Sequence, residues 1–319
     1  MRINLPDNPA AARLIAVLAG AAGSFMLFAA YAVIPAAGLI SGLLAPFPAL
    51  YATLRFSRMT AVAVTLGAAA ILATVFGIQV AVLYLLQCVV IAHLLPELFV
   101  RGYSVARIMI WTTAINLMLF VVAALTFAAL SGVNIHSLAV TEINGSISQA
   151  LTIYEKAGVK GEELEAMKKS MSMAAALISR IYPALMTVML MVMAGFNLAL
   201  IRRFAGRTGY EVKLENFNDF RMPEQIIWLL IAAGFALLSS NPVINTPALN
   251  LVVVLSVFYF LQGLAVLLTI IARLAYPGVI RIGLYMMLLF QPYLAALVAL
   301  FGMFDLWGDF RTPRKQENL

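Results

Sequence analysis

Nine long apolar runs, separated by mostly short connections, constrain this chain more than any other feature of its sequence. A helix needs about 20 apolar residues to cross the hydrocarbon of a bilayer, and backbone groups in lipid must be hydrogen-bonded within the segment, which favours helices. The sequence therefore predicts an all-α fold, a polytopic transmembrane helical bundle with eight or nine spans. The runs occupy residues 14–34, 36–54, 59–77, 80–99, 108–130, 181–201, 225–240, 248–272 and 282–302.

The composition excludes a soluble domain, since 63% of the residues are hydrophobic and 11% are charged, whereas soluble domains carry about 25% charged residues. The run from Leu14 is longer than the apolar core of a secretory signal peptide, so we expect it to be retained as a span. The single cysteine, Cys88, lies in an apolar run, and we expect a buried thiol.

Basic residues concentrate in alternate connections. The connections that contain Arg55 and Arg58, and Arg101 and Arg107, are basic, as is the loop 202–224, whereas residues 78–79 and 241–247 carry no charge. Basic loops stay in the cytoplasm, so the N-terminus is predicted to be cytoplasmic.

The number of spans stays open because the tail conflicts with this pattern. Nine crossings place the tail outside, although it carries Arg311, Arg314 and Lys315. Either the tail is an exception, or a run broken by proline does not cross fully; Pro46 in the second run and Pro292 in the last are the sites of such a break.

The connection 131–180 is long and polar, and apolar residues spaced three to four apart predict a helix in its first half. Gly158 and Gly161 end that helix, and the acidic residues from Glu162 favour the start of a second one, which continues into the run 181–201. We therefore expect an extracytoplasmic helical hairpin. The predicted divisions are a five-span region (1–130), the insertion (131–180), a second membrane region (181–304) and an interfacial tail (305–319).

Ionisable and amide side chains inside apolar runs are the candidate functional residues, because burying them is costly. His93 and Glu97 lie four residues apart, on one helix face, as in a proton relay or solute site. The alternative is structural: Glu97 pairs with Arg101 while His93 bonds a neighbouring helix. The amides either line a solute cavity or hold helices together; the candidates for binding are Gln87, Asn116, Gln262 and Gln291, and Asn197 and Asn250 belong to the same class.

Near the C-terminus, the tail from Asp305 to Arg311 follows the last run directly. Trp307 favours the membrane–water boundary, and Asp305 and Asp309 need partners there, with Arg311 available. We predict a structural clasp in preference to a Mg²⁺ site. Residues 241–247 are rich in turn-forming types and predict a loop.

No phosphate-binding glycine loop, zinc motif or nucleophile elbow is present in the sequence, so we expect neither an enzyme nor a bound metal or cofactor. The positive net charge of +7 is spread over short loops beside apolar runs, which indicates lipid rather than nucleic acid as the partner.

Two segments carry a resemblance to a known family: Tyr259-Phe-Leu-Gln-Gly-Leu-Ala265 and Gly302-Met-Phe-Asp-Leu-Trp-Gly-Asp-Phe-Arg311, helped by Pro223-Glu-Gln. The chain resembles the YybS-like bacterial inner-membrane proteins. That family is distantly similar to the substrate-binding S components of energy-coupling-factor transporters and to the rod-shape protein MreD. The resemblance implies a multi-pass inner-membrane protein that binds a small solute.

Two functions follow from these observations. The first is transport-related binding of a small solute, with a membrane protein as partner. The alternative is a non-transporting scaffold or assembly factor of the cell envelope. A polar cavity near the midplane favours the first, and continuous apolar packing favours the second.

Overall fold

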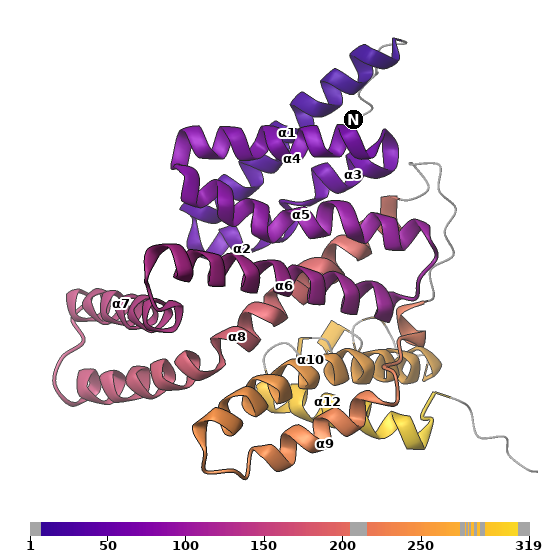
Figure 1. Cartoon of the computed structure of the whole chain (residues 1–319). Coiled ribbons are helices and arrows are strands. Elements are labelled where there is room, and N and C mark those ends of the chain that lie inside the picture. Colours follow the sequence, from indigo (N-terminus) through magenta and orange to yellow (C-terminus); the bar gives the residue numbers. More distant parts are fainter. Residues whose placement is uncertain are drawn as a thin grey trace, which may run out of the picture. The chain divides into compact units, whose positions relative to one another are not determined.

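The computed structural model describes residues 8–204, 216–274, 278, 280, 282–283, 286–287 and 291–311. Every regular element in these ranges is helical (Figure 1). The elements are α1 (Pro9–Val33), α2 (Pro35–Leu44), α3 (Phe47–Arg55), α4 (Arg58–Phe76), α5 (Ile78–Val100), α6 (Val105–Ser131), α7 (Ile135–Lys156), α8 (Glu162–Phe204), the 3-10 turn η2 (Phe217–Asp219), α9 (Ile226–Ala236), α10 (Pro242–Arg273) and α12 (Pro292–Gly308).

Among the described residues, six helices are long and apolar enough to cross a membrane: α1, α4, α5, α6, α8 and α10. Two shorter apolar helices are Ile226–Ala236 and Tyr293–Gly308. The second apolar run is broken into α2 and α3 at Ala45–Pro46, where proline removes a backbone donor. The chain is therefore a multi-pass helical membrane protein by length and composition.

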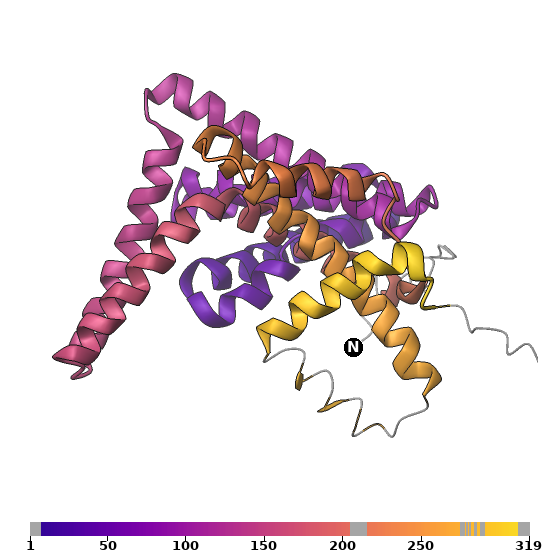
Figure 2. The same ribbon diagram turned by 90° about the horizontal axis from the view of Figure 1, so that it is seen from below.

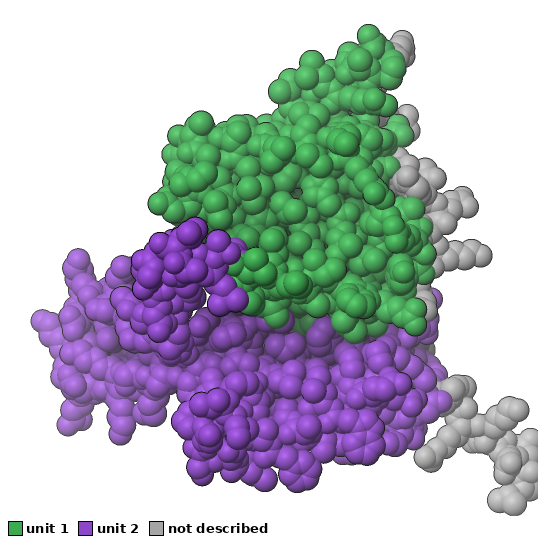
Figure 3. Space-filling model, viewed as in Figure 1, with its two compact units in different colours: residues 1–122, 189–215 green, residues 123–188, 216–319 purple. Residues whose placement is uncertain are grey.

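The chain divides into two compact units (Figure 3). Unit 1 contains residues 1–122 and 189–215, and unit 2 contains residues 123–188 and 216–319. The boundaries at 122/123 and 188/189 fall inside the continuous helices α6 and α8.

Unit 1 is built around α1, α3, α4 and α5, which pack against one another. Its core includes Phe28, Leu72, Tyr84 and Cys88, all of them almost fully buried. The buried thiol predicted for Cys88 is confirmed. α2 folds back onto α1, since a Cβ atom added at Gly42 would lie 2.9 Å from the Tyr31 ring.

In unit 2, α7 and the first part of α8 form an antiparallel hairpin (Figure 2). Lys168 of α8 lies 3.5 Å from Glu155 of α7, and His136 stacks on Tyr182. Gly158 and Gly161 both adopt positive φ between the two helices, a conformation that glycine adopts at little cost. The predicted helix break is confirmed, and so is the continuation of α8 into the apolar run.

The loop predicted at residues 241–247 is wrong, because these residues form the start of α10. The Asn241 side chain accepts a hydrogen bond from the Val243 amide, which caps the helix. Pro242 is the first helical residue, a position where the missing N–H of proline costs nothing.

Candidate functional site

In unit 2, α10 and α12 approach each other closely at two glycines. A Cβ atom added at Gly263 would lie 1.8 Å from the carbonyl oxygen of Val298, and one added at Gly302 would lie 2.0 Å from the carbonyl oxygen of Tyr259. Small residues let two helix backbones approach in this way. The two segments that carry the family resemblance therefore meet at this crossing.

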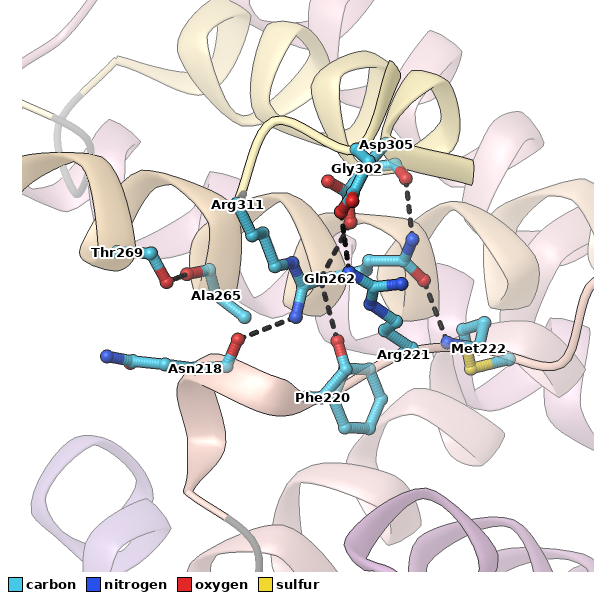
Figure 4. Close-up of polar contacts among 11 residues, drawn as sticks. Asn218, Phe220, Arg221, Met222, Gln262, Ala265, Thr269, Gly302, Asp305 and Arg311 are labelled. Carbon is cyan, nitrogen blue, oxygen red and sulfur yellow. Dashed lines mark hydrogen bonds and ion pairs between the residues drawn. The ribbon is translucent and has the colours of Figure 1, made fainter. Parts of the chain in front are cut away.

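Gln262, one of the predicted solute ligands, uses both ends of its amide at the same crossing (Figure 4). Its Oε1 accepts from the backbone N–H of Met222 at 2.8 Å, and its Nε2 donates to the carbonyl oxygen of Gly302 at 2.9 Å. The side chain is fully buried. Gln262 thus joins α10, α12 and the segment that follows η2.

Arg311, just beyond α12, contacts both Asp305 of that helix and the backbone around η2 (Figure 4). The Arg311 guanidinium lies 2.9 Å from an Asp305 carboxylate oxygen, and both side chains are buried. It also donates to the carbonyl oxygens of Asn218 and Phe220, at 2.6 and 2.8 Å. Burial lowers the pKa of Arg311, and the Asp305 carboxylate opposes that shift.

A second pair lies at the surface of this region. Arg221 lies 2.7 Å from Asp309. Asp309 caps the C-terminal end of α12 with a left-handed φ of 35°, a conformation that aspartate tolerates better than most residues do. Trp307 is 66% exposed and contacts Phe304. Of the four residues predicted for the clasp, Asp305, Asp309 and Arg311 make polar contacts to residues of this region, and the Trp307 ring lies on the outer surface of α12.

In unit 1, His93 and Glu97 both face α4. The His93 Nε2 atom lies 3.2 Å from the Thr65 hydroxyl, which donates its one proton to the Ala61 carbonyl oxygen. Glu97 forms ion pairs with Arg58 and with Arg101. The two residues have separate partners, as in the structural alternative.

Gln87 and Asn116 are brought together by the packing of α5 and α6. The Asn116 Nδ2 donates to the Gln87 backbone carbonyl at 3.2 Å, and Asn116 is fully buried. The side-chain oxygens of both residues are buried without a hydrogen-bond partner among the described residues.

Two threonines of α6 extend this group. The hydroxyls of Thr112 and Thr113 are also buried and without a hydrogen-bond partner in the described part of the chain. They precede Asn116 by four and three residues, so they lie on the same face of α6. We call Gln87, Thr112, Thr113 and Asn116 the amide–hydroxyl group. Sequence reasoning missed both threonines, although their spacing from Asn116 was a usable signal.

The six predicted solute residues are distributed over both units. Gln87, His93, Glu97 and Asn116 belong to unit 1, and Gln262 and Gln291 to unit 2. Gln291 is exposed and precedes α12.

Other amides of the same class hold helices together. Asn197 donates to the carbonyl oxygens of Leu43 and Met193, both at 2.8 Å. Asn250 of α10 accepts from the Ala184 amide and donates to the Arg180 carbonyl, beside Pro183 of α8. These contacts bridge α8 to α2 and to α10.

A model of the family described as "Predicted membrane protein (DUF2232)" matches residues 22–306. This match includes the glycine crossing, Gln262 and the amide–hydroxyl group. Searches of curated proteins and of solved structures found no match. The chain therefore belongs to the DUF2232 family of predicted membrane proteins.

Proposed function

We propose that this membrane protein binds a small solute in unit 1, at the amide–hydroxyl group, as part of a transport process. The observation that carries the proposal is a set of buried polar atoms without hydrogen-bond partners among the described residues. They are the Gln87 Oε1, the Asn116 Oδ1 and the hydroxyls of Thr112 and Thr113.

Leaving a buried polar group unpaired costs about 1–3 kcal/mol. Four such atoms on two adjacent helices represent a cost that apolar residues would avoid. A solute with hydrogen-bond donors would satisfy the two amide oxygens directly, and a hydroxyl can either donate or accept. The group contains no charged side chain, which favours a neutral solute.

The resemblance to S components of energy-coupling-factor transporters supports the same function, because those components bind small solutes among membrane helices. In this proposal the N-terminus is cytoplasmic, the chain crosses the bacterial inner membrane eight or nine times, and the α7–α8 hairpin lies outside. A second membrane protein supplies the energy for transport.

The alternative is an envelope scaffold, and a specific observation favours it. α7 has no buried residue in its 22 residues, so the hairpin offers a large surface to another protein. Gln262, Asn197 and Asn250 also serve helix packing. A scaffold requires no bound solute, which separates the two functions experimentally.

Isosteric replacement of the threonines tests the proposal. Thr113→Val removes an unpaired hydroxyl, whereas Thr187→Val is the matched control, because the buried Thr187 hydroxyl donates to the Pro183 carbonyl. Native mass spectrometry of the full chain should detect a small molecule that is retained by wild type and by Thr187→Val and is depleted in Thr113→Val.

The thermal stability of the same variants gives an independent result. If a solute is bound, Thr113→Val lowers the melting temperature, and the decrease is larger the more solute the variant loses. If no solute is present, the substitution removes a buried unpaired hydroxyl and raises the melting temperature. An increase, together with no retained small molecule in wild type, would refute solute binding.

The proposed orientation has its own test. In a Cys88→Ser background, Lys160→Cys should react with a membrane-impermeant thiol reagent added outside intact cells. Labelling of this position only after the cells are permeabilised would show that the topology is the opposite of the proposed one.

A further inference from the structure

An ionic cluster at one end of unit 1 is not used by the proposed solute site. Arg58 is the first residue of α4 and Arg101 directly follows α5, and both guanidiniums form ion pairs with Glu97. The contact between Arg101 and Glu97 measures 2.7 Å. The carboxylate thus holds two guanidiniums from neighbouring helices next to each other.

The two arginines keep most of their surface exposed. The side chain of Arg58 is 71% exposed and that of Arg101 is 60% exposed, whereas Glu97 is 24% exposed. A guanidinium has five N–H donors, and Glu97 occupies only some of them. The cluster has a net charge of +1, so it has both the free donors and the charge to bind one further anionic group.

Apolar side chains lie beside both arginines in the sequence. Met59 follows Arg58 and is 80% exposed, and Val100 precedes Arg101 and is 42% exposed. Both belong to helices that are apolar enough to span a membrane. Cationic groups at the end of a span, next to exposed apolar surface, match the two halves of a phospholipid: an anionic headgroup and acyl chains.

We propose that Arg58 and Arg101 bind the headgroup phosphate of an anionic phospholipid at the membrane surface. Arginine suits this role because its planar fork binds phosphate oxygens in pairs. Glu97 is a positioning residue, which holds the guanidiniums side by side without contacting the lipid. This assignment gives Glu97 a role other than proton transfer.

The charge of Glu97 makes the proposal distinguishable from general attraction to an anionic membrane. Glu97→Gln raises the net charge of the cluster from +1 to +2, so non-specific attraction predicts stronger binding of anionic lipid. A specific site predicts weaker binding of anionic lipid in this variant, because the two guanidiniums lose the carboxylate that holds them together. The two explanations therefore differ in the sign of the effect.

The test uses the full chain in detergent with added phosphatidylglycerol, phosphatidylcholine or inorganic phosphate. Native mass spectrometry counts retained lipid, and the melting temperature measures stabilisation. We expect phosphatidylglycerol to be retained and to raise the melting temperature, phosphatidylcholine to do so weakly, and inorganic phosphate to have no effect.

The variants distinguish a specific lipid site from non-specific attraction of anionic lipid by the positive charge. Arg58→Gln, Arg101→Gln and Glu97→Gln should each reduce phosphatidylglycerol retention several-fold. Arg13→Gln removes the same charge from an exposed position on α1 and should leave retention unchanged. If Arg58→Gln does not fold, Glu97→Gln and Arg101→Gln carry the test.

Three results would overturn the proposal: equal losses in Arg13→Gln and Arg101→Gln, an increase in lipid retention in Glu97→Gln, or equal stabilisation by inorganic phosphate.

Discussion

Amide side chains within apolar helices have different surroundings in the two units. At the α10–α12 crossing, both ends of the Gln262 amide are hydrogen-bonded to backbone groups. Between α5 and α6, the Asn116 amide nitrogen is bonded, while the oxygens of Asn116 and Gln87 are not bonded to any described residue. An amide bonded at both its oxygen and its nitrogen stabilises packing, and a buried oxygen without a partner keeps the capacity to accept a hydrogen bond. Gln262 therefore serves helix packing in unit 2, and the unpaired oxygens of Gln87 and Asn116 are the basis of the proposed solute site in unit 1.

The largest effect is expected from the buried ion pair that accompanies Gln262. Asp305→Ala leaves the buried Arg311 guanidinium without its carboxylate, and removing one partner of such a pair costs about 3–5 kcal/mol. The melting temperature of the purified protein in detergent should fall sharply.

Added Mg²⁺ provides a control for this first prediction. The melting temperature of wild type should not depend on Mg²⁺ if Asp305 acts through Arg311. A melting temperature unaffected by Asp305→Ala would show that the C-terminal contacts do not stabilise unit 2.

The glycine crossing should give the next largest effect. Gly302→Ala places a methyl group against the backbone of Tyr259 and Gly263, and overpacking of this kind costs about 1–3 kcal/mol. Gly234→Ala of α9 is the control, because an added Cβ there meets nothing within 4 Å and alanine favours helix. Gly302→Ala should lower the melting temperature and Gly234→Ala should not. Equal effects of the two substitutions would mean that the close approach is not needed.

Replacing the two amides with leucine tests the comparison itself. Gln262→Leu leaves the Met222 N–H and the Gly302 carbonyl without their partner, at a cost of about 1–3 kcal/mol. Asn116→Leu removes one hydrogen bond and one unpaired oxygen, so its effect on the protein without solute should be smaller. Melting temperatures measured after extensive dialysis compare the two. A larger decrease in melting temperature for Asn116→Leu than for Gln262→Leu would contradict the roles given to the two regions.

The smallest effect is expected at the surface pair of Arg221 and Asp309, whose side chains are 55% and 48% exposed. Exposed ion pairs contribute about 0–1 kcal/mol and are screened by salt. Asp309→Asn should change the melting temperature slightly at low salt and not at high salt. A large change that persists in high salt would place Asp309 among the essential contacts of the clasp.

The number of spans could not be derived from the apolar runs alone. The run 36–54 contains no charged residue, but Pro46 lies at the break between α2 and α3. The run 225–240 contains only the 11 residues of α9, and α10 begins at Pro242, ahead of its predicted start. Hydropathy measures the cost of exposing a segment to water, whereas helix ends depend on proline, caps and local hydrogen bonds.

The sequence by itself determined the all-helical membrane class, the break at Gly158 and Gly161 and the buried state of Cys88. These features depend on local properties: the length of an apolar run, a backbone that needs positive φ, and a small apolar side chain. The same information identified Gln87, Asn116 and Gln262 as equivalent amides in apolar helices. Only the tertiary structure decided which amides are hydrogen-bonded at both ends, and that Arg311 contacts both Asp305 and the 3-10 turn at Asn218. Hydrogen-bond partners far apart in the sequence are set by how the helices cross, and no local pattern in this chain specifies those crossings.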